Sequence, residues 1–263
     1  MIEFTFAQWQ AWLAAFFWPF ARITAFAMAS PLWGHSSVPR QVKLGLALLL
    51  CMALVPVLPP APPIALFSWA GVGVLVEQMV IGVAMGLTLR IMFAVVQAAG
   101  EFIGLQMGLG FATFVSPETG TNTMVLSRLF YMITLLMYLA VDGHLIAIDA
   151  LAGSFHTLPV GLLGLDAGAM ELLARFGGTV FMSGLQLALP LVGALLVVNL
   201  SLGILNRSAP QLTVFSVGFP MSLTLGIFLL SVLMTDFGRF LQSLFGTGLA
   251  FLQQLPAALA GLP

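Results

Sequence analysis

Long apolar stretches dominate the chain, and short breaks rich in proline and glycine separate them. A helix needs about 20 apolar residues to cross a bilayer. Stretches of this kind cover residues 8–33, 43–60, 64–89, 124–151, 179–205 and 212–236, and a last apolar segment covers residues 240–259. They are continuous and rich in Leu, Ala, Met and Phe, whereas the strands of a membrane barrel alternate in weak segments of about ten residues. The pattern predicts an all-α, polytopic, membrane-associated helical protein with six spans and a terminal helix.

Composition strengthens the membrane prediction and removes other classes of protein. Of the 263 residues, 60% are hydrophobic and 6% are charged, whereas a soluble domain is about 45–50% apolar and about 25% charged. The net charge is −1 and the chain never places three basic residues together, which excludes a nucleic-acid-binding protein. Cys51 is the single cysteine and can form no internal disulfide. The acidic N-terminus does not fit a signal peptide, so we expect the first apolar segment to be retained.

Glycines recur every four residues in two places, which predicts a strip of bare backbone along one helix face. Such a strip lets a second helix approach closely, as small residues do in membrane proteins. Two interpretations fit the spacing: contacts between helices of one subunit, and close packing against other subunits. The glycines of these strips are Gly82, Gly86, Gly100, Gly104 and Gly108.

The longest interruption of the apolar pattern, residues 90–123, ends in an unusual loop. Its central part is aromatic and apolar, is flanked by glycine and proline, and has no charge before Glu118. A loop of this composition can close a wide channel by apolar packing and can be displaced when the channel opens. The loop consists of Gly110, Phe111, Ala112, Thr113, Phe114, Val115, Ser116 and Pro117.

A few ionisable residues lie within or beside the apolar runs. Each costs about 2.5–3.5 kcal/mol on insertion, so each needs a partner or a wet cavity. A secondary transporter would use such groups near the membrane midplane, beside broken helices in two related halves. Here the charges are scattered and no corresponding breaks are visible, which favours a structural role in ion pairs. The charges are Arg22, Glu77, Asp142 and Asp149, with Arg90 and Glu101 flanking the central segment.

Signatures of the common membrane enzymes and pumps are absent from the sequence. It has no H-E-x-x-H zinc helix, no G-x-S-x-G nucleophile elbow and no phosphate-binding loop. The histidines His35, His144 and His156 have no Cys or carboxylate at ligand spacing, so no metal site is predicted. For His144, which follows Asp142 and Gly143, a hydrogen-bonded side chain at a helix break is favoured over a proton relay. We therefore expect no enzyme, no metal and no cofactor.

Basic residues give a weak indication of orientation in the membrane. With the N-terminus outside, five of them fall on the cytoplasmic side and two fall outside, which is the direction of the positive-inside rule. The five are Arg40, Lys43, Arg90, Arg128 and Arg207, and the two are Arg175 and Arg239.

Short blocks in a fixed order across nearly the whole chain resemble the FliR family of flagellar export-gate proteins and their injectisome counterparts. Any one block alone is a weak signal, whereas the ordered set is specific. The blocks are Arg22 with residues 31–34, 37–39 and 43–47, then residues 100–108 with 111–112, 142–145, 158–161, 209–212 and 217–220. Residues 214–220 resemble the flagellar branch of the family more than the injectisome branch. Asp142 and Thr213 stand where flagellar members often have Asn.

The resemblance implies a fold and a set of partners. It implies a subunit of the protein-conducting gate in the bacterial inner membrane, at the centre of the flagellar basal body. In that family, kinked helical hairpins pack with FliP and FliQ into a hetero-oligomeric helical ring that stands largely on the periplasmic side of the bilayer. The chain would form one domain, residues 1–263, with a FliP-like portion to about residue 200 and a FliQ-like portion from about 201 to 263.

The resemblance also implies a path for cargo. FlhB would wrap the entrance, FlhA and the basal-body membrane ring would be neighbours, and unfolded rod, hook and filament proteins would pass through. The family's pore plug carries onto residues 110–117, where we expect Phe111, Phe114 and Val115 to close the lumen by apolar packing. The alternatives are a stand-alone secondary transporter or small-solute channel and, third, a polytopic enzyme.

Overall fold

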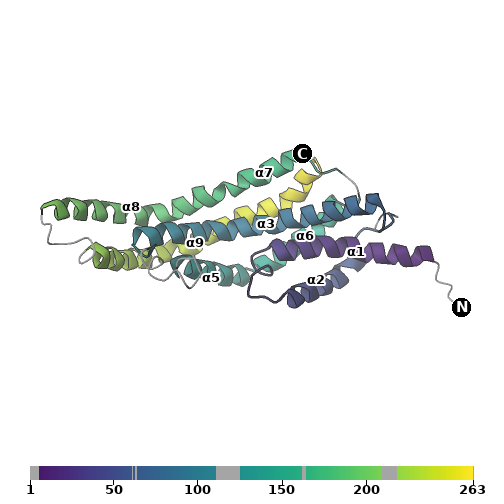
Figure 1. Cartoon of the computed structure of the whole chain (residues 1–263), viewed down its shortest axis with the longest axis horizontal. Coiled ribbons are helices and arrows are strands. Elements are labelled where there is room, and N and C mark those ends of the chain that lie inside the picture. The colour runs from purple at the N-terminus through teal and green to yellow at the C-terminus, as the bar shows by residue number, and fades with distance from the viewer. Residues whose placement is uncertain are drawn as a thin grey trace. The chain divides into compact units, whose positions relative to one another are not determined.

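A computed structural model describes residues 6–60, 62, 64–110, 125–161, 164–208 and 218–262 of the chain. These residues form helices and connections, and no strand occurs among them (Figure 1). The helices are α1 (Phe6–Ala29), α2 (Arg40–Leu54), the short 3-10 helix η1 (Val55–Val57), α3 (Trp69–Gln106), α5 (Val125–Ala140), α6 (Gly143–Thr157), α7 (Ala167–Gly177), α8 (Thr179–Ser208) and α9 (Phe219–Leu259). Five stretches are long and apolar enough to cross a membrane, or up to six if the bent pair α5 and α6 counts as one span. The all-α polytopic prediction is confirmed.

Two helices are much longer than the hydropathy pattern predicts. Helix α3 runs for 38 residues through the expected break at Arg90, and α9 runs for 41 residues through the expected break between residues 236 and 240. Charged side chains end an apolar run, but these residues keep the backbone N–H and C=O groups that a helix uses, so the helix continues. At about 1.5 Å per residue these helices are about 57 and 62 Å long, about twice the hydrocarbon thickness.

The predicted span over residues 124–151 is interrupted in its middle. Helix α5 ends at Ala140, and α6 begins at Gly143 after Asp142, which has a left-handed φ of 55°. The Asp142 carbonyl accepts hydrogen bonds from the N–H groups of Leu145 and Ile146 at 2.9 and 3.2 Å and so starts α6. Apart from glycine, Asn and Asp visit this conformation most readily. Asp142 can therefore serve where flagellar members often have Asn.

The chain divides into two compact units that interleave along the sequence. Unit 1 contains residues 1–91, 142–177 and 246–263, and unit 2 contains residues 92–141 and 178–245. Both α3 and α9 contribute residues to each unit. This division rests on contacts within the chain. The expected boundary at about residue 200 rests on likeness to other subunits, and it stays a prediction.

In unit 1, α2 runs antiparallel to α1 and lies beside it (Figure 1). The Cys51 thiol lies 3.6 Å from the Phe16 carbonyl oxygen, and near the other end the Lys43 ammonium donates to the Gly34 carbonyl at 2.9 Å. The contact face of α2 is narrow, because Ala47 and Cys51 are its only buried residues. Five more residues of α2 are partly covered, and the other eight are exposed in the described part of this chain.

Helix α3 runs parallel to α1 in unit 1. Val74, near the start of α3, packs in one cluster with Trp18, and Gly86 further along lies against Ala29. Because α1 and α3 advance together while α2 returns, the start of α3 lies at the same end of unit 1 as the C-terminus of α2.

Aromatic side chains from three helices form the core of unit 2. The Phe93 and Tyr138 ring centroids are 5.5 Å apart, as are those of Tyr138 and Phe245, and Phe130 lies 5.0 Å from Phe237. These separations are typical of favourable edge or tilted ring pairs. They join α3, α5 and α9 within this unit.

Candidate functional site

A buried arginine joins three segments of unit 1. Arg22 of α1 is 0% exposed, and its Nε donates to Oε1 of Gln78 on α3 at 2.8 Å. Its Nη1 donates to the carbonyl and the hydroxyl of Ser154 on α6, at 3.0 and 3.1 Å, and its Nη2 donates to the Leu158 carbonyl at 2.8 Å. The planar guanidinium supplies donors in a fixed fork. These four contacts make Arg22 the polar tie between α1, α3 and the end of α6.

Two further groups complete this Arg22 centre. The Arg22 Cζ lies 4.1 Å from the centroid of the Phe155 ring, in cation–π geometry. Glu77, next to Gln78, is 8% exposed and interacts electrostatically with Arg22. The structure thus gathers Arg22 and Glu77, two of the scattered charges of the sequence, into one centre.

The remaining predicted charges do not join this centre. Arg90, Glu101, Asp142 and Asp149 are exposed on the surfaces of their units. Within the described ranges, no group of three or more His, Cys, Asp or Glu residues lies together in a way that could hold a metal ion. These charges are therefore placed where water or another chain can meet them.

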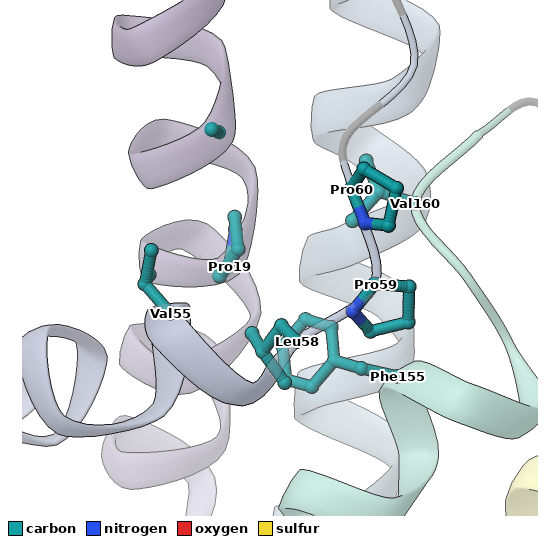
Figure 2. A pocket seen from close by; sticks show the side chains of 8 residues that line it. Pro19, Val55, Leu58, Pro59, Pro60, Phe155 and Val160 are labelled. Carbon is teal, nitrogen blue, oxygen red and sulfur yellow. The ribbon is translucent and has the colours of Figure 1, made fainter.

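A small apolar cavity of about 80 Å³ lies beside the Arg22 centre (Figure 2). Pro19 of α1, Leu58 of the connection after η1 and Phe155 of α6 are among the residues that line it (Figure 2). Its full lining is Ala15, Pro19, Val55, Leu58, Pro59, Pro60, Phe155 and Val160. None of these side chains ionises, and the volume is below the roughly 300 Å³ of typical ligand pockets. The cavity therefore offers no acid, base or nucleophile.

The glycines of α3 mark places where a neighbouring helix touches its backbone. A Cβ added at Gly82 would meet the Arg22 carbonyl and would lie 2.8 Å from the Ala25 Cβ. A Cβ at Gly86 would lie 2.7 Å from the Ala29 Cβ. Both glycines thus allow α1 of the same chain to pack closely against the backbone of α3.

The second glycine strip makes a similar contact in unit 2. A Cβ at Gly100 would lie 2.6 Å from the Cα of Ser127 on α5, and the Ser127 hydroxyl donates to the Gln97 carbonyl at 2.9 Å. Gly104 is buried one turn further on. A role of these glycines in a contact with other subunits stays a prediction.

The placement of Gly108 on the helical strip needs correction. Helix α3 ends at Gln106, and Gly108 follows with a φ of 82°. The Gly108 N–H donates to the Leu105 carbonyl at 3.0 Å, and the Leu109 N–H donates to the Gly104 carbonyl at 2.9 Å. This is the Schellman pattern, in which glycine takes the left-handed position after a helix. Gly108 therefore ends α3, a role that four-residue spacing does not reveal.

Met107 anchors the start of the predicted plug within unit 2, and sequence reasoning gave it no role. Its side chain is 2% exposed, and a Cβ added at Gly226 of α9 would lie 2.6 Å from its Cγ. Gly110 is the one described residue of the loop, and residues 111–117 lie outside the described part of the chain. The structure therefore fixes where the loop leaves α3.

Comparison with known proteins decides the family. The profile of bacterial export proteins, family 1, matches residues 13–248. The chain belongs to this family. The match extends from α1 into α9, which confirms the resemblance inferred from the ordered blocks.

Relatives of this export family carry a flagellar name. The flagellar biosynthetic protein FliR of Escherichia coli strain K12 is 46% identical over 93% of this chain and 94% of its own length. The FliR of Pectobacterium carotovorum is 44% identical over 92% of this chain and 93% of its own, and that of Bacillus subtilis 32% identical over 84% and 86%. The chain is thus a FliR-type inner-membrane component of the flagellar export apparatus.

Proposed function

We propose that this chain is a subunit of a protein-conducting gate. With FliP and FliQ it would form the channel through which unfolded rod, hook and filament proteins cross the inner membrane. FlhB would lie at the entrance, and FlhA and the basal-body membrane ring would be neighbours. The chain itself would carry out no enzymatic step.

The observation that carries this proposal is apolar surface that one bilayer cannot cover. In an apolar window of 18 residues, only 17% of the residues of α9 and 22% of those in the stretch Ala167–Leu205 are buried within the chain. Helix α9 is about twice as long as the hydrocarbon layer is thick. Partner helices that continue the packing would cover the part that lies outside lipid.

A charged pair on α9 supports a position partly outside the bilayer. Asp236 and Arg239 lie 3.4 Å apart near the middle of the helix, and their side chains are 75% and 87% exposed. Charges this exposed are costly in hydrocarbon. Their level therefore favours a position outside the hydrocarbon, facing other subunits or a wet lumen.

Within this gate, residues 110–117 would form the plug. The Schellman turn at Gly108 and the buried Met107 support this, because together they hold the loop's first residue in place. Phe111, Phe114 and Val115 would then exclude ions by apolar packing until a substrate displaces them.

Removal of the plug is expected to make cells leaky. Cells producing the gate with residues 110–117 deleted, or with Phe111, Phe114 and Val115 all changed to Ser, should show higher ion conductance and greater sensitivity to small toxic molecules. The matched control changes Phe111 and Phe114 to Leu and Val115 to Ile, which keeps the loop apolar and should not leak. An unchanged leak from a Ser variant that still copurifies with FliP and FliQ would refute the plug.

A further inference from the structure

Among the candidate spans in the described part of the chain, helix α2 is the one least covered by the chain itself. Of the 18 residues Arg40–Val57, 11% are buried, against 67% of an 18-residue apolar window within Trp69–Gln106. Every side chain from residue 44 to residue 57 is apolar. The exposed ones include Leu49 at 65%, Met52 at 60% and Val57 at 71%. A surface of this length without a hydrogen-bonding group fits hydrocarbon better than a lumen.

The two ends of this surface differ in a way that a bilayer explains. Arg40 and Lys43 lie in the first turn of α2, and the next charged residue in the chain is Glu77. At the other end, where α2 finishes and α3 begins, Phe67 is 100% and Trp69 is 92% exposed. Basic residues favour anionic headgroups, and Trp is enriched at membrane–water interfaces.

The spacing of the two ends matches a bilayer. The 18 residues of the window Arg40–Val57 rise about 27 Å, close to the roughly 30 Å thickness of the hydrocarbon core. Because α3 runs antiparallel to α2, Trp69 stands at the level of the C-terminal end of this window. The aromatic pair and the basic pair are thus about one hydrocarbon thickness apart.

We propose that α2 is the lipid-facing helix of unit 1. Arg40 and Lys43 lie among anionic phospholipid headgroups of the cytoplasmic leaflet, and Phe67 and Trp69 lie in the opposite interface. Helix α1 lies against α2 and is shielded from lipid on that side. This placement uses only contacts within unit 1 and does not require the gate, so the two proposals can fail separately.

Spin labels on α2 test the placement directly. The full chain, with Cys51→Ala, is labelled singly at Leu49→Cys or Met52→Cys and reconstituted in nanodiscs of phosphatidylcholine and phosphatidylglycerol. Gln41→Cys and Phe67→Cys report the two ends, and Glu171→Cys on exposed α7 provides an aqueous reference. Collision rates are measured with oxygen, which enters lipid, and with a water-soluble nickel complex.

The expected ratio of oxygen to nickel collisions is several-fold higher at residues 49 and 52 than at residue 171. It should fall towards both residue 41 and residue 67. Low rates with both reagents at residues 49 and 52 would mean that protein covers α2, and high nickel rates there would mean that water does. Either result overturns the proposal.

A second measurement tests the headgroup contact. Native mass spectrometry counts the phosphatidylglycerol molecules retained by the chain after release from the same nanodiscs. Arg40→Gln should retain fewer than the unchanged chain, whereas Arg175→Gln on α7 should retain the same number. Equal retention by Arg40→Gln and the unchanged chain would refute the assignment of Arg40 to anionic headgroups.

Discussion

Replacement of Arg22 by Met is expected to destabilise the protein by about 3–5 kcal/mol, the usual effect of removing one partner from a buried charged network. The change leaves the Gln78 side-chain oxygen and the Leu158 carbonyl without their donor and removes the charge that faces Glu77. Methionine has similar length, so the loss reports hydrogen bonds and charge more than volume. The measurement is the free energy of unfolding of the full chain in mixed micelles titrated with dodecyl sulfate.

The matched control is Arg175→Met on α7. Arg175 also makes a short ion pair, to Glu171 at 2.7 Å, but the two side chains are 77% and 65% exposed. An exposed i,i+4 pair contributes roughly 0.3–0.5 kcal/mol, so this variant should unfold almost like the unchanged chain. If the two variants lost equal stability, the Arg22 centre would not be what holds α1, α3 and α6 together.

Gly82→Ala is expected to lower stability by about 1–3 kcal/mol, because the methyl group enters a contact that is already closed. It would meet the Arg22 carbonyl and the Ala25 Cβ, so α1 must move away from α3. That movement also pulls Arg22 from Gln78, which adds to the loss. The free energy of unfolding, measured as for Arg22→Met, reports the change.

Gly193→Ala on α8 is the control for Gly82→Ala. A Cβ at Gly193 meets nothing within 4 Å. Alanine is favoured over glycine inside a helix by roughly 0.5–1 kcal/mol, so this variant should gain stability. The same change from Gly to Ala should therefore lower the stability at Gly82 and raise it at Gly193. A gain in stability at Gly82 would show that α1 and α3 are not in close contact there.

The start of α2 shows what the sequence could predict well. The predicted span 43–60 and the observed window Arg40–Val57 nearly coincide. Pro39 precedes the helix as its N-cap residue, and Pro56 lies in the 3-10 turn that closes it. Proline fixes its own backbone angle and lacks a donor, so it marks helix boundaries locally. At these two positions the local signal was sufficient, whereas Pro19, Pro190 and Pro256 lie inside helices.

Long-range partners could not be predicted in this way. The apolar setting of Arg22 indicated that it needs partners, but those partners are 56, 132 and 136 residues away in the chain. Local periodicity contains no information about such pairings. The polar Gln78 inside an apolar run, next to Glu77, was the one available signal.

The breaks expected at Arg90 and Asp236 failed for a different reason. Hydropathy measures transfer to lipid, whereas a helix end depends on backbone geometry and capping. At Gly108 the geometry is visible as a left-handed glycine, and there the helix does end. A charged side chain leaves the backbone N–H and C=O groups able to continue the helix.

Native mass spectrometry of the full chain coexpressed with the FliP and FliQ of its own organism distinguishes a gate subunit from a stand-alone transporter. The gate account predicts one hetero-oligomer that contains all three proteins, and it predicts that the chain is not stable as a homo-oligomer without them. A monodisperse homo-oligomer that forms in their presence and excludes both would contradict the account and favour a stand-alone transporter or channel.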